Sequence, residues 1–134
     1  MNLFVDTSVW SLALRRDGPA VAPEVDFLKQ ALWTGAPILT TGLVLQELLQ
    51  GFAGPKNREA IVKRFAPLPY IMPQRDDYIA AAELRNVCRR AGLQVGTIDA
   101  LLTTLCIARS LVILTTDTDF TRIAELQPLV VWQP

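Results

Sequence analysis

Leu3-Phe4-Val5-Asp6-Thr7-Ser8 is the stretch that decides the fold, because three apolar residues lead directly into an acid and two hydroxyl side chains. A short, continuous apolar run predicts a strand that is buried on both faces, as in a parallel sheet. A Ser or Thr after such a strand favours the start of a helix, which we expect near Val9. Asp6 is then expected at the carboxyl end of a central strand, where open α/β sheets bind their ligands. The alternative is that Asp6, with Ser8, only caps this helix.

The rest of the chain alternates between segments typical of strands and of helices. Further strands are expected at 37–41, 67–73, 111–115 and 129–132, of which 67–73 is an edge strand because prolines bracket it. Helices are expected at about 9–14, 23–33, 43–52, 55–65, 76–91, 98–108 and 118–124. This alternation predicts an α/β fold, a single three-layer domain over residues 1–134, with a central, mainly parallel sheet of about five strands flanked by helices.

Two local expectations follow from this pattern. The most apolar strands, 3–5 and 111–114, should lie at the centre of the sheet. If they are neighbours where the winding reverses, Asp6 and Asp117 both face the crevice at that point. Asp76 is expected to cap the helix at 76–91.

Composition bounds the possible functions. The chain has 134 residues, of which 51% are hydrophobic, so it can form a real core. Its 13 basic and 13 acidic residues cancel, so no global field attracts nucleic acid and any RNA contact must be local. The absence of His excludes Ser-His-Asp and Cys-His catalysis and removes the usual ligands of zinc.

The cysteines and the apolar segments indicate a cytoplasmic protein. Cys88 and Cys106 occur in apolar helical contexts without a CxxC motif, so we expect buried thiols in a reducing compartment. The most apolar window, 98–115, carries Asp99 and Arg109 and is interpreted as a helix and a strand, not as a membrane span. The acid inside the first apolar run also argues against a signal peptide.

Several acids occur where acids are unexpected. Glu47 and Asp99 lie in helices that are apolar nearly all round, which predicts burial. Buried carboxylates are costly without a partner. Glu47 could pair with Arg85 or Arg89, and Asp99 could interact with the helix dipole. For Asp117 and Asp119 the alternative is an ordinary turn.

Together, however, these acids should meet at one edge of the sheet. Asp6 and Asp117 follow central strands, while Glu47 and Asp99 are expected in the first turns of helices that begin at that edge. Two such charges about 4 Å apart repel by about 4 kcal/mol at an effective dielectric near 20, so the cluster needs protonation, basic partners or a cation. Oxygen ligands alone select Mg²⁺ or Mn²⁺, which points to phosphoryl chemistry. The hydroxyl groups of Thr7, Ser8 and Thr116 border these acids and could position a water or a phosphate oxygen. For Ser8 and Thr116, helix capping and turn bonding explain the hydroxyl equally well.

Four motifs resemble those of a PIN domain, and the nearest likeness is to the VapC-type ribonuclease toxins of toxin–antitoxin pairs. They are Val5-Asp6-Thr7-Ser8-Val9-Trp10, Glu47 in the helix after the second strand, Asp99-Ala100-Leu101-Leu102, and Leu114-Thr115-Thr116-Asp117-Thr118-Asp119-Phe120. The resemblance covers nearly the whole chain. One departure is that the last motif lacks the Arg-Asp or similar pair often seen there.

The resemblance implies both a site and partners. It makes Asp6, Glu47, Asp99 and Asp117 the catalytic and metal-binding quartet for Mg²⁺ or Mn²⁺, with Asp119, Thr7 and Thr116 in supporting positions. It also implies endoribonuclease activity on RNA, a homodimer, and a small antitoxin whose C-terminal segment blocks the site. Within the last motif we assign Asp117 to the metal, because Asp119 directly precedes a short helix that it could cap.

Other functions compete with this interpretation. A phosphatase of the haloacid dehalogenase type needs an acid at the position of Ser8, and a receiver domain needs an Asp after Ile71-Met72. A catalytically silent module that holds a basic partner segment in its acidic cluster remains the alternative. The apolar composition favours a dimer that buries helices near Phe52, Ile61 and Phe65, or the helix at 76–91.

Overall fold

A parallel four-stranded sheet forms the centre of the computed structural model, which describes residues 1–15, 17–18 and 20–134. In these described residues the strand order is β2-β1-β3-β4. The strands are β1 (Leu3–Val5), β2 (Ile38–Leu39), β3 (Val112–Leu114) and β4 (Val130–Val131). The order along the sheet reverses direction between β1 and β3, which makes their carboxyl ends the switch point.

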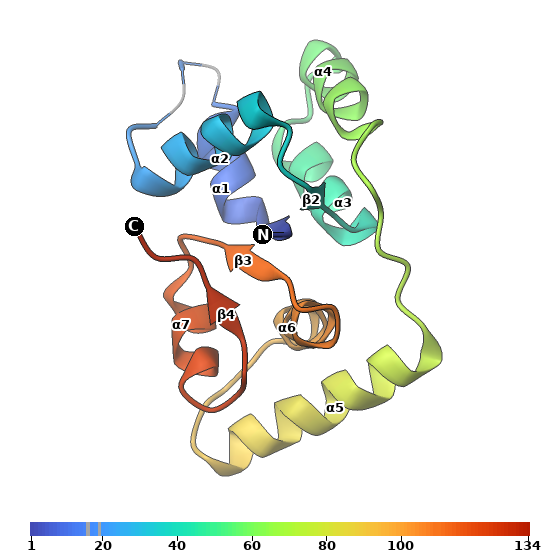
Figure 1. Cartoon of the computed structure of the whole chain (residues 1–134). Coiled ribbons are helices and arrows are strands. Elements are labelled where there is room, and N and C mark those ends of the chain that lie inside the picture. The colour runs from blue at the N-terminus through green and yellow to red at the C-terminus, as the bar shows by residue number, and fades with distance from the viewer. Residues whose placement is uncertain (16, 19) are drawn as a thin grey trace.

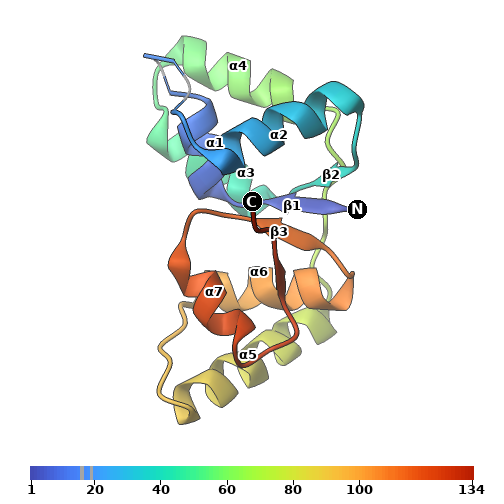
Figure 2. The same cartoon turned by 60° about the vertical axis from the view of Figure 1, so that its left-hand side comes forward.

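Seven helices of the described residues cover both faces of the sheet. They are α1 (Thr7–Ala13), α2 (Pro23–Thr34), α3 (Gly42–Gly51), α4 (Pro55–Phe65), α5 (Arg75–Arg90), α6 (Thr97–Ala108) and α7 (Thr118–Ala124). Figures 1 and 2 show α1 to α4 on one side of the sheet and α5 to α7 on the other. The predicted three-layer α/β fold is therefore confirmed.

The expected edge strand at 67–73 is reduced to a single bridge. Tyr70 pairs in parallel with Thr40, whose N–H donates to Pro69 O at 3.0 Å and whose carbonyl accepts from Ile71 N–H at 2.8 Å. The prolines at 67, 69 and 73 lack an N–H group, so a longer ladder cannot form here. The sheet consequently has four strands and one bridge where about five strands were expected.

The two central strands are deeply buried. Leu3, Val5 and Leu114 are at most 1% exposed, and Val5 pairs with Leu114 at the end of the β1–β3 ladder. The core continues into the helices, where the rings of Trp10 and Phe65 lie 4.9 Å apart. Cys88 and Cys106 are buried free thiols, as expected.

Two further expectations concern surfaces. Ile61 and Phe65 are buried in the core of this chain, so their side chains cannot form the expected dimer surface, whereas Val62 between them is 41% exposed. No helix of the described ranges combines the length and the apolar character that a membrane crossing requires.

Asp77, and not the expected Asp76, closes the N-terminus of α5. The Asp77 carboxylate accepts from the N–H of Gln74 at 2.7 Å, which completes a capping box. It also accepts two hydrogen bonds from the guanidinium of Arg109, at 3.1 and 3.2 Å, which ties α5 to the end of α6. The Arg109 bonds and then the Gln74 bond hold the pKa of Asp77 below its ordinary value.

We expect Asp77→Ala to lower the free energy of unfolding by about 2 kcal/mol, since it removes a cap and one partner of a partly exposed ion pair. Asp76→Ala is the control, because Asp76 is an exposed residue in the first turn of α5, where its charge is favoured by the helix dipole, so its loss should cost less than about 1 kcal/mol. Urea unfolding of both variants measures the difference. Equal losses would mean that the capping box and the ion pair contribute nothing measurable.

Candidate functional site

Asp6 lies at the carboxyl end of β1, as predicted, and its backbone N–H donates to Leu114 O of β3 at 2.9 Å. α1 begins at Thr7, two residues earlier than expected, so Asp6 itself occupies the N-cap position. Its side chain nevertheless accepts no capping hydrogen bond. The alternative that Asp6 only caps the helix is therefore wrong, and its carboxylate is engaged elsewhere.

Two hydroxyls orient the Asp6 carboxylate. Ser8 Oγ donates to Asp6 Oδ2 at 2.8 Å, and Thr115 Oγ1 donates to the same oxygen at 2.9 Å. Each hydroxyl has a single hydrogen, and both hydrogens are used in the bonds to Asp6. The two hydroxyl oxygens lie 3.3 Å apart but therefore form no hydrogen bond with each other. Oδ2 is thus held by two donors, and no hydrogen bond to Oδ1 is found among the described residues.

Backbone amides in turn hold these two hydroxyls. The N–H of Thr116 donates to Ser8 Oγ at 3.1 Å, and the N–H of Asp117 donates to Thr115 Oγ1 at 3.0 Å. The loop after β3 therefore orients Asp6 across the sheet. Sequence reasoning missed Thr115, although a hydroxyl directly after the apolar run of β3 was a usable signal. Thr116 contributes its backbone, and its side chain is exposed.

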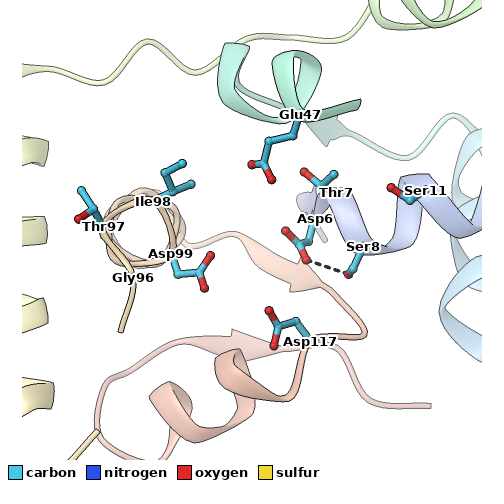
Figure 3. A pocket seen from close by; sticks show the side chains of 10 residues that line it. All are labelled: Asp6, Thr7, Ser8, Ser11, Glu47, Gly96, Thr97, Ile98, Asp99 and Asp117. Carbon is cyan, nitrogen blue, oxygen red and sulfur yellow. Dashed lines mark hydrogen bonds between the residues drawn. The ribbon is translucent and has the colours of Figure 1, made fainter. Parts of the chain in front are cut away.

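The four predicted acids line one pocket of about 580 Å³ at this edge of the sheet. Figure 3 shows the carboxylates of Asp6, Glu47, Asp99 and Asp117 converging from β1, α3, α6 and the loop before α7. The hydroxyl residues Thr7, Ser8 and Ser11 complete the wall along α1. Thr7 Oγ1 is buried and has no hydrogen-bond partner among the described residues. The functional groups in the pocket wall are therefore carboxylates and hydroxyls, all of which can bind a metal ion through oxygen.

Glu47 and Asp99 differ from the expected burial. Glu47 lies in the second turn of α3 and is exposed, because only the Val44 and Leu48 side of that helix is buried. Asp99 is half-buried in the first turn of α6, and the next seven residues are all buried, as predicted for that helix. No ion pair joins Glu47 to Arg85 or Arg89 in the described part of the chain.

Burial and mutual repulsion raise the pKa of two of these carboxyls. For Glu47, desolvation raises the pKa above 4.5, and the charge of Asp6 raises it further. For Asp99 the pKa reaches about 6, with burial as the first cause, followed by the charges of Asp6, Asp117, Asp119 and Glu47. The acids therefore lie close enough to oppose one another's ionisation.

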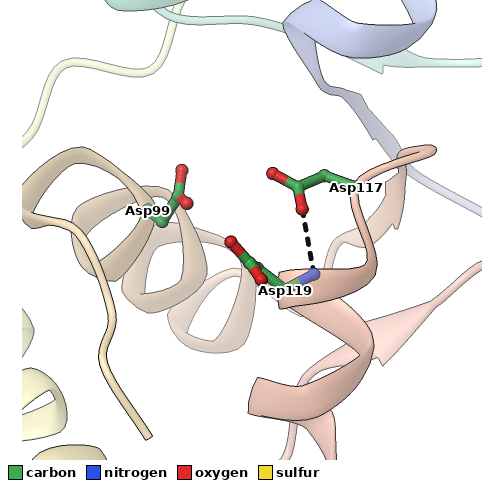
Figure 4. A group of neighbouring side chains, drawn as sticks. All are labelled: Asp99, Asp117 and Asp119. Carbon is green, nitrogen blue, oxygen red and sulfur yellow. Dashed lines mark hydrogen bonds between the residues drawn. The ribbon is translucent and has the colours of Figure 1, made fainter.

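Asp117 both caps α7 and lines the pocket, whereas the sequence suggested Asp119 for the cap. Asp117 is the N-cap of α7, and its Oδ1 accepts from the N–H of Asp119 at 2.9 Å. Asp119 instead lies in the first turn of α7, 3.5 Å from Arg122. Figure 4 shows Asp99, Asp117 and Asp119 side by side, and one carboxylate oxygen of each lies within 4.8 Å of the others. Capping therefore does not explain Asp119, which does not line the large pocket but borders it through Asp99 and Asp117.

These side chains fit a hard divalent cation. The donors are carboxylate and hydroxyl oxygens, which suit Mg²⁺ or Mn²⁺ and disfavour softer ions. The described residues provide no guanidinium or ammonium group in the pocket wall to neutralise the four carboxylates. A bound cation is the simplest means of lowering their repulsion.

Comparison with known proteins supports a family assignment. The family model of the PIN domain matches residues 3–126. The chain is similar to VapBC2 from Rickettsia felis, solved with a DNA fragment from the VapBC2 proteins' promoter. The sequence identity is 22%, the match covers 98% of each chain, and the TM-score is 0.74. DNA-bound VapBC from Salmonella typhimurium has 18% identity, covers 98% of this chain and 97% of its own, and has a TM-score of 0.76.

A third similar structure is VapC20 from Mycobacterium tuberculosis, a Sarcin-Ricin loop cleaving toxin, with 20% identity, coverage of 90% of this chain and 94% of its own, and a TM-score of 0.66. At these identities the likeness to solved structures concerns the fold. No match was found among the curated proteins. The resemblance expected from the sequence is confirmed by the family match and by the VapBC structures.

We expect Asp99→Asn to raise the Tm of protein kept in chelator at about pH 8. The folded-state pKa of about 6 lies above the ordinary value of 3.8, so the folded state holds this proton more tightly. Stability therefore falls as the pH rises from about 4 to 6, and the full penalty applies above that range. The asparagine carries no such charge, so the gain in Tm should be large at pH 8 and small near pH 4.

Thermal melts of the wild type and of Asp99→Asn across this pH range test the expectation. Glu59→Gln, which changes an exposed acid on α4, is the control and should leave Tm nearly unchanged. A gain from Asp99→Asn that is equally large at pH 4 would contradict the explanation by charge repulsion.

Proposed function

The chain belongs to the PIN domain family, and from this premise we propose that it is a metal-dependent endoribonuclease, the toxin of a toxin–antitoxin pair. The observation that supports the proposal is the convergence of four carboxylates on one open pocket at the switch point of the sheet. Residues 1–134 would form one nuclease domain, and hydrolysis of RNA phosphodiesters would be its reaction.

In this proposal Asp6, Glu47, Asp99 and Asp117 hold Mg²⁺ or Mn²⁺, with Asp119 beside them. The bound ion would polarise the phosphodiester and lower the pKa of a water molecule, so that this water becomes a nucleophile near neutral pH. Ser8 and Thr115 keep the Asp6 carboxylate in one orientation, leaving Oδ1 for the pocket. Such outer hydrogen bonds typically determine how well a ligand binds its metal.

Thr7 and Glu47 have separate tasks. Thr7 Oγ1 is buried at the pocket wall without a partner among the described residues, so it can donate a hydrogen bond to a phosphate oxygen. Glu47 is the exposed member of the quartet and has a raised pKa, so its carboxylate is placed to take up a proton from the pocket water.

RNA as substrate, an antitoxin partner and a cytoplasmic location complete the proposal. The similar structures include VapBC complexes and a toxin that cleaves the Sarcin-Ricin loop, which supports the toxin assignment. A basic residue of the antitoxin would enter the carboxylate pocket, where a charge-assisted pair competes with the metal. A homodimer would use the outer surface of α5, where Ile79 and Val87 are exposed.

The alternative is a catalytically silent module that uses the acidic pocket only to hold a basic partner segment. The carboxylates alone fit this function as well. Metal-dependent cleavage of RNA distinguishes the two functions, because the silent module would show none.

Purified protein should cleave total cellular RNA when Mg²⁺ or Mn²⁺ is present, and cleavage should stop in excess chelator. Sequencing of the new RNA ends measures the cleavage. Asp6→Asn removes a proposed ligand and should slow cleavage by more than about 100-fold, because even the loss of an outer partner costs about 10–100-fold. Cleavage that persists in chelator would exclude the metal mechanism, and no cleavage in any condition would favour the silent module.

We further expect Thr115→Val to weaken Mn²⁺ binding by about 10–100-fold, since it removes one of the two donors to Asp6 without changing volume. Thr103→Val is the matched control, because Thr103 is also buried and its hydroxyl has no partner among the described residues. Calorimetric titration with Mn²⁺ measures both variants. Equal affinity in the two would mean that the hydroxyl does not orient the ligand.

A further inference from the structure

A second pocket of about 340 Å³ lies directly beside the carboxylate pocket, between α3, α5 and α6. The two pockets share Thr97 and Ile98 in their walls, so they adjoin each other. Leu43 lines the second pocket on one side, and Tyr78 and Asn86 line it on the other. Its volume is within the range of about 300–1,000 Å³ that is usual for small-molecule sites.

We infer that this second pocket is a nucleobase subsite, which holds an unpaired base of a single-stranded RNA next to the phosphate in the carboxylate pocket. The inference rests on the proposed function. It adds to that function a base-binding pocket and a specificity-determining residue, Tyr78.

The chemistry of the two pockets is complementary to the two halves of a nucleotide. The carboxylate pocket can accept a phosphate only together with a cation. No acid is found among the described residues that line the second pocket, and its wall is mostly apolar with one arginine, Arg85. An uncharged, flat base is suited to such a wall, whereas a phosphate is not.

Tyr78 provides the stacking surface. It is 55% exposed on α5, borders the pocket and has no ring partner among the described residues. Bases of single strands stack on exposed aromatic rings, a contact that is worth about 1–3 kcal/mol per base. Tyr78 therefore offers a face that the fold itself does not use.

Arg85 and Asn86 provide polar contacts for the base edge. Arg85 Nε donates to Val95 O at 2.8 Å, which fixes the guanidinium, and no hydrogen bond occupies its terminal nitrogens in the described ranges. The amide of Asn86 lies on the same side of α5 and carries both a donor and an acceptor. Such groups read the edges of unstacked bases.

The binding test uses fluorescent single-stranded RNA hexamers and an abasic ribose-phosphate hexamer of equal charge. All proteins carry Asp6→Asn, so that the strands stay intact, and fluorescence anisotropy in Mn²⁺ gives the affinities. Tyr78→Ala should weaken binding of base-containing strands by about 5- to 150-fold, which corresponds to 1–3 kcal/mol, and leave binding of the abasic strand unchanged. Tyr78→Phe should bind like the parent.

Tyr70→Ala is the matched control, because it removes the chain's other tyrosine, which is 41% exposed and does not line the pocket. An equal loss for base-containing and abasic strands, no loss at all, or no binding by the parent would overturn the subsite. Light scattering of each protein without RNA gives a further outcome. If Tyr78→Ala halves the mass of a dimeric parent, the pocket is covered by a second copy and the inference is wrong.

This measurement does not depend on cleavage. If the base-dependent loss is found but RNA is never cleaved, the subsite stands and the nuclease proposal fails. If RNA is cleaved but Tyr78→Ala changes neither binding nor the nucleotides at the cleavage ends, the nuclease proposal stands and the subsite fails.

Discussion

Repulsion among carboxylates at one edge of a parallel sheet is the constraint on which this molecule depends. The register that pairs Val5 with Leu114 makes β1 and β3 end together, so the residues that follow them meet. This pairing brings Asp6 and Asp117 together, and the first turn of α6 adds Asp99 to the same pocket. The apolar burial of the two strands stabilises an arrangement that the charges oppose, which is common at functional sites.

Much of this arrangement could be predicted because the decisive signals are local and periodic. Three apolar residues before Asp6 indicate a buried strand, and the second such run ends at Leu114. Two buried strands in an α/β chain are expected to be central neighbours, which brings their terminal acids together. The order of elements and the meeting of the four acids at one edge of the sheet therefore follow from the sequence.

Other features depended on three-dimensional contacts that no local pattern contains. Thr115 matters because it reaches across to Asp6, more than a hundred positions away in the chain. Asp117 caps α7 because that helix begins at Thr118, as expected, which places Asp119 inside its first turn and not before it. Burial of Glu47 was overestimated since the apolar residues of α3 pack on one side only. Helix boundaries and long-range side-chain bonds limit such predictions.

The pocket draws its carboxylates from both helical layers. Glu47 comes from α3, on one side of the sheet, while Asp99 and the Asp117 loop belong to the other side (Figure 2). An ion held by all of them would cross-link two layers that otherwise share mainly the sheet. Its binding energy would add to the free energy of unfolding by mass action. The divalent-ion concentration of the surroundings would then also set how often the chain opens to proteases, and so its lifetime.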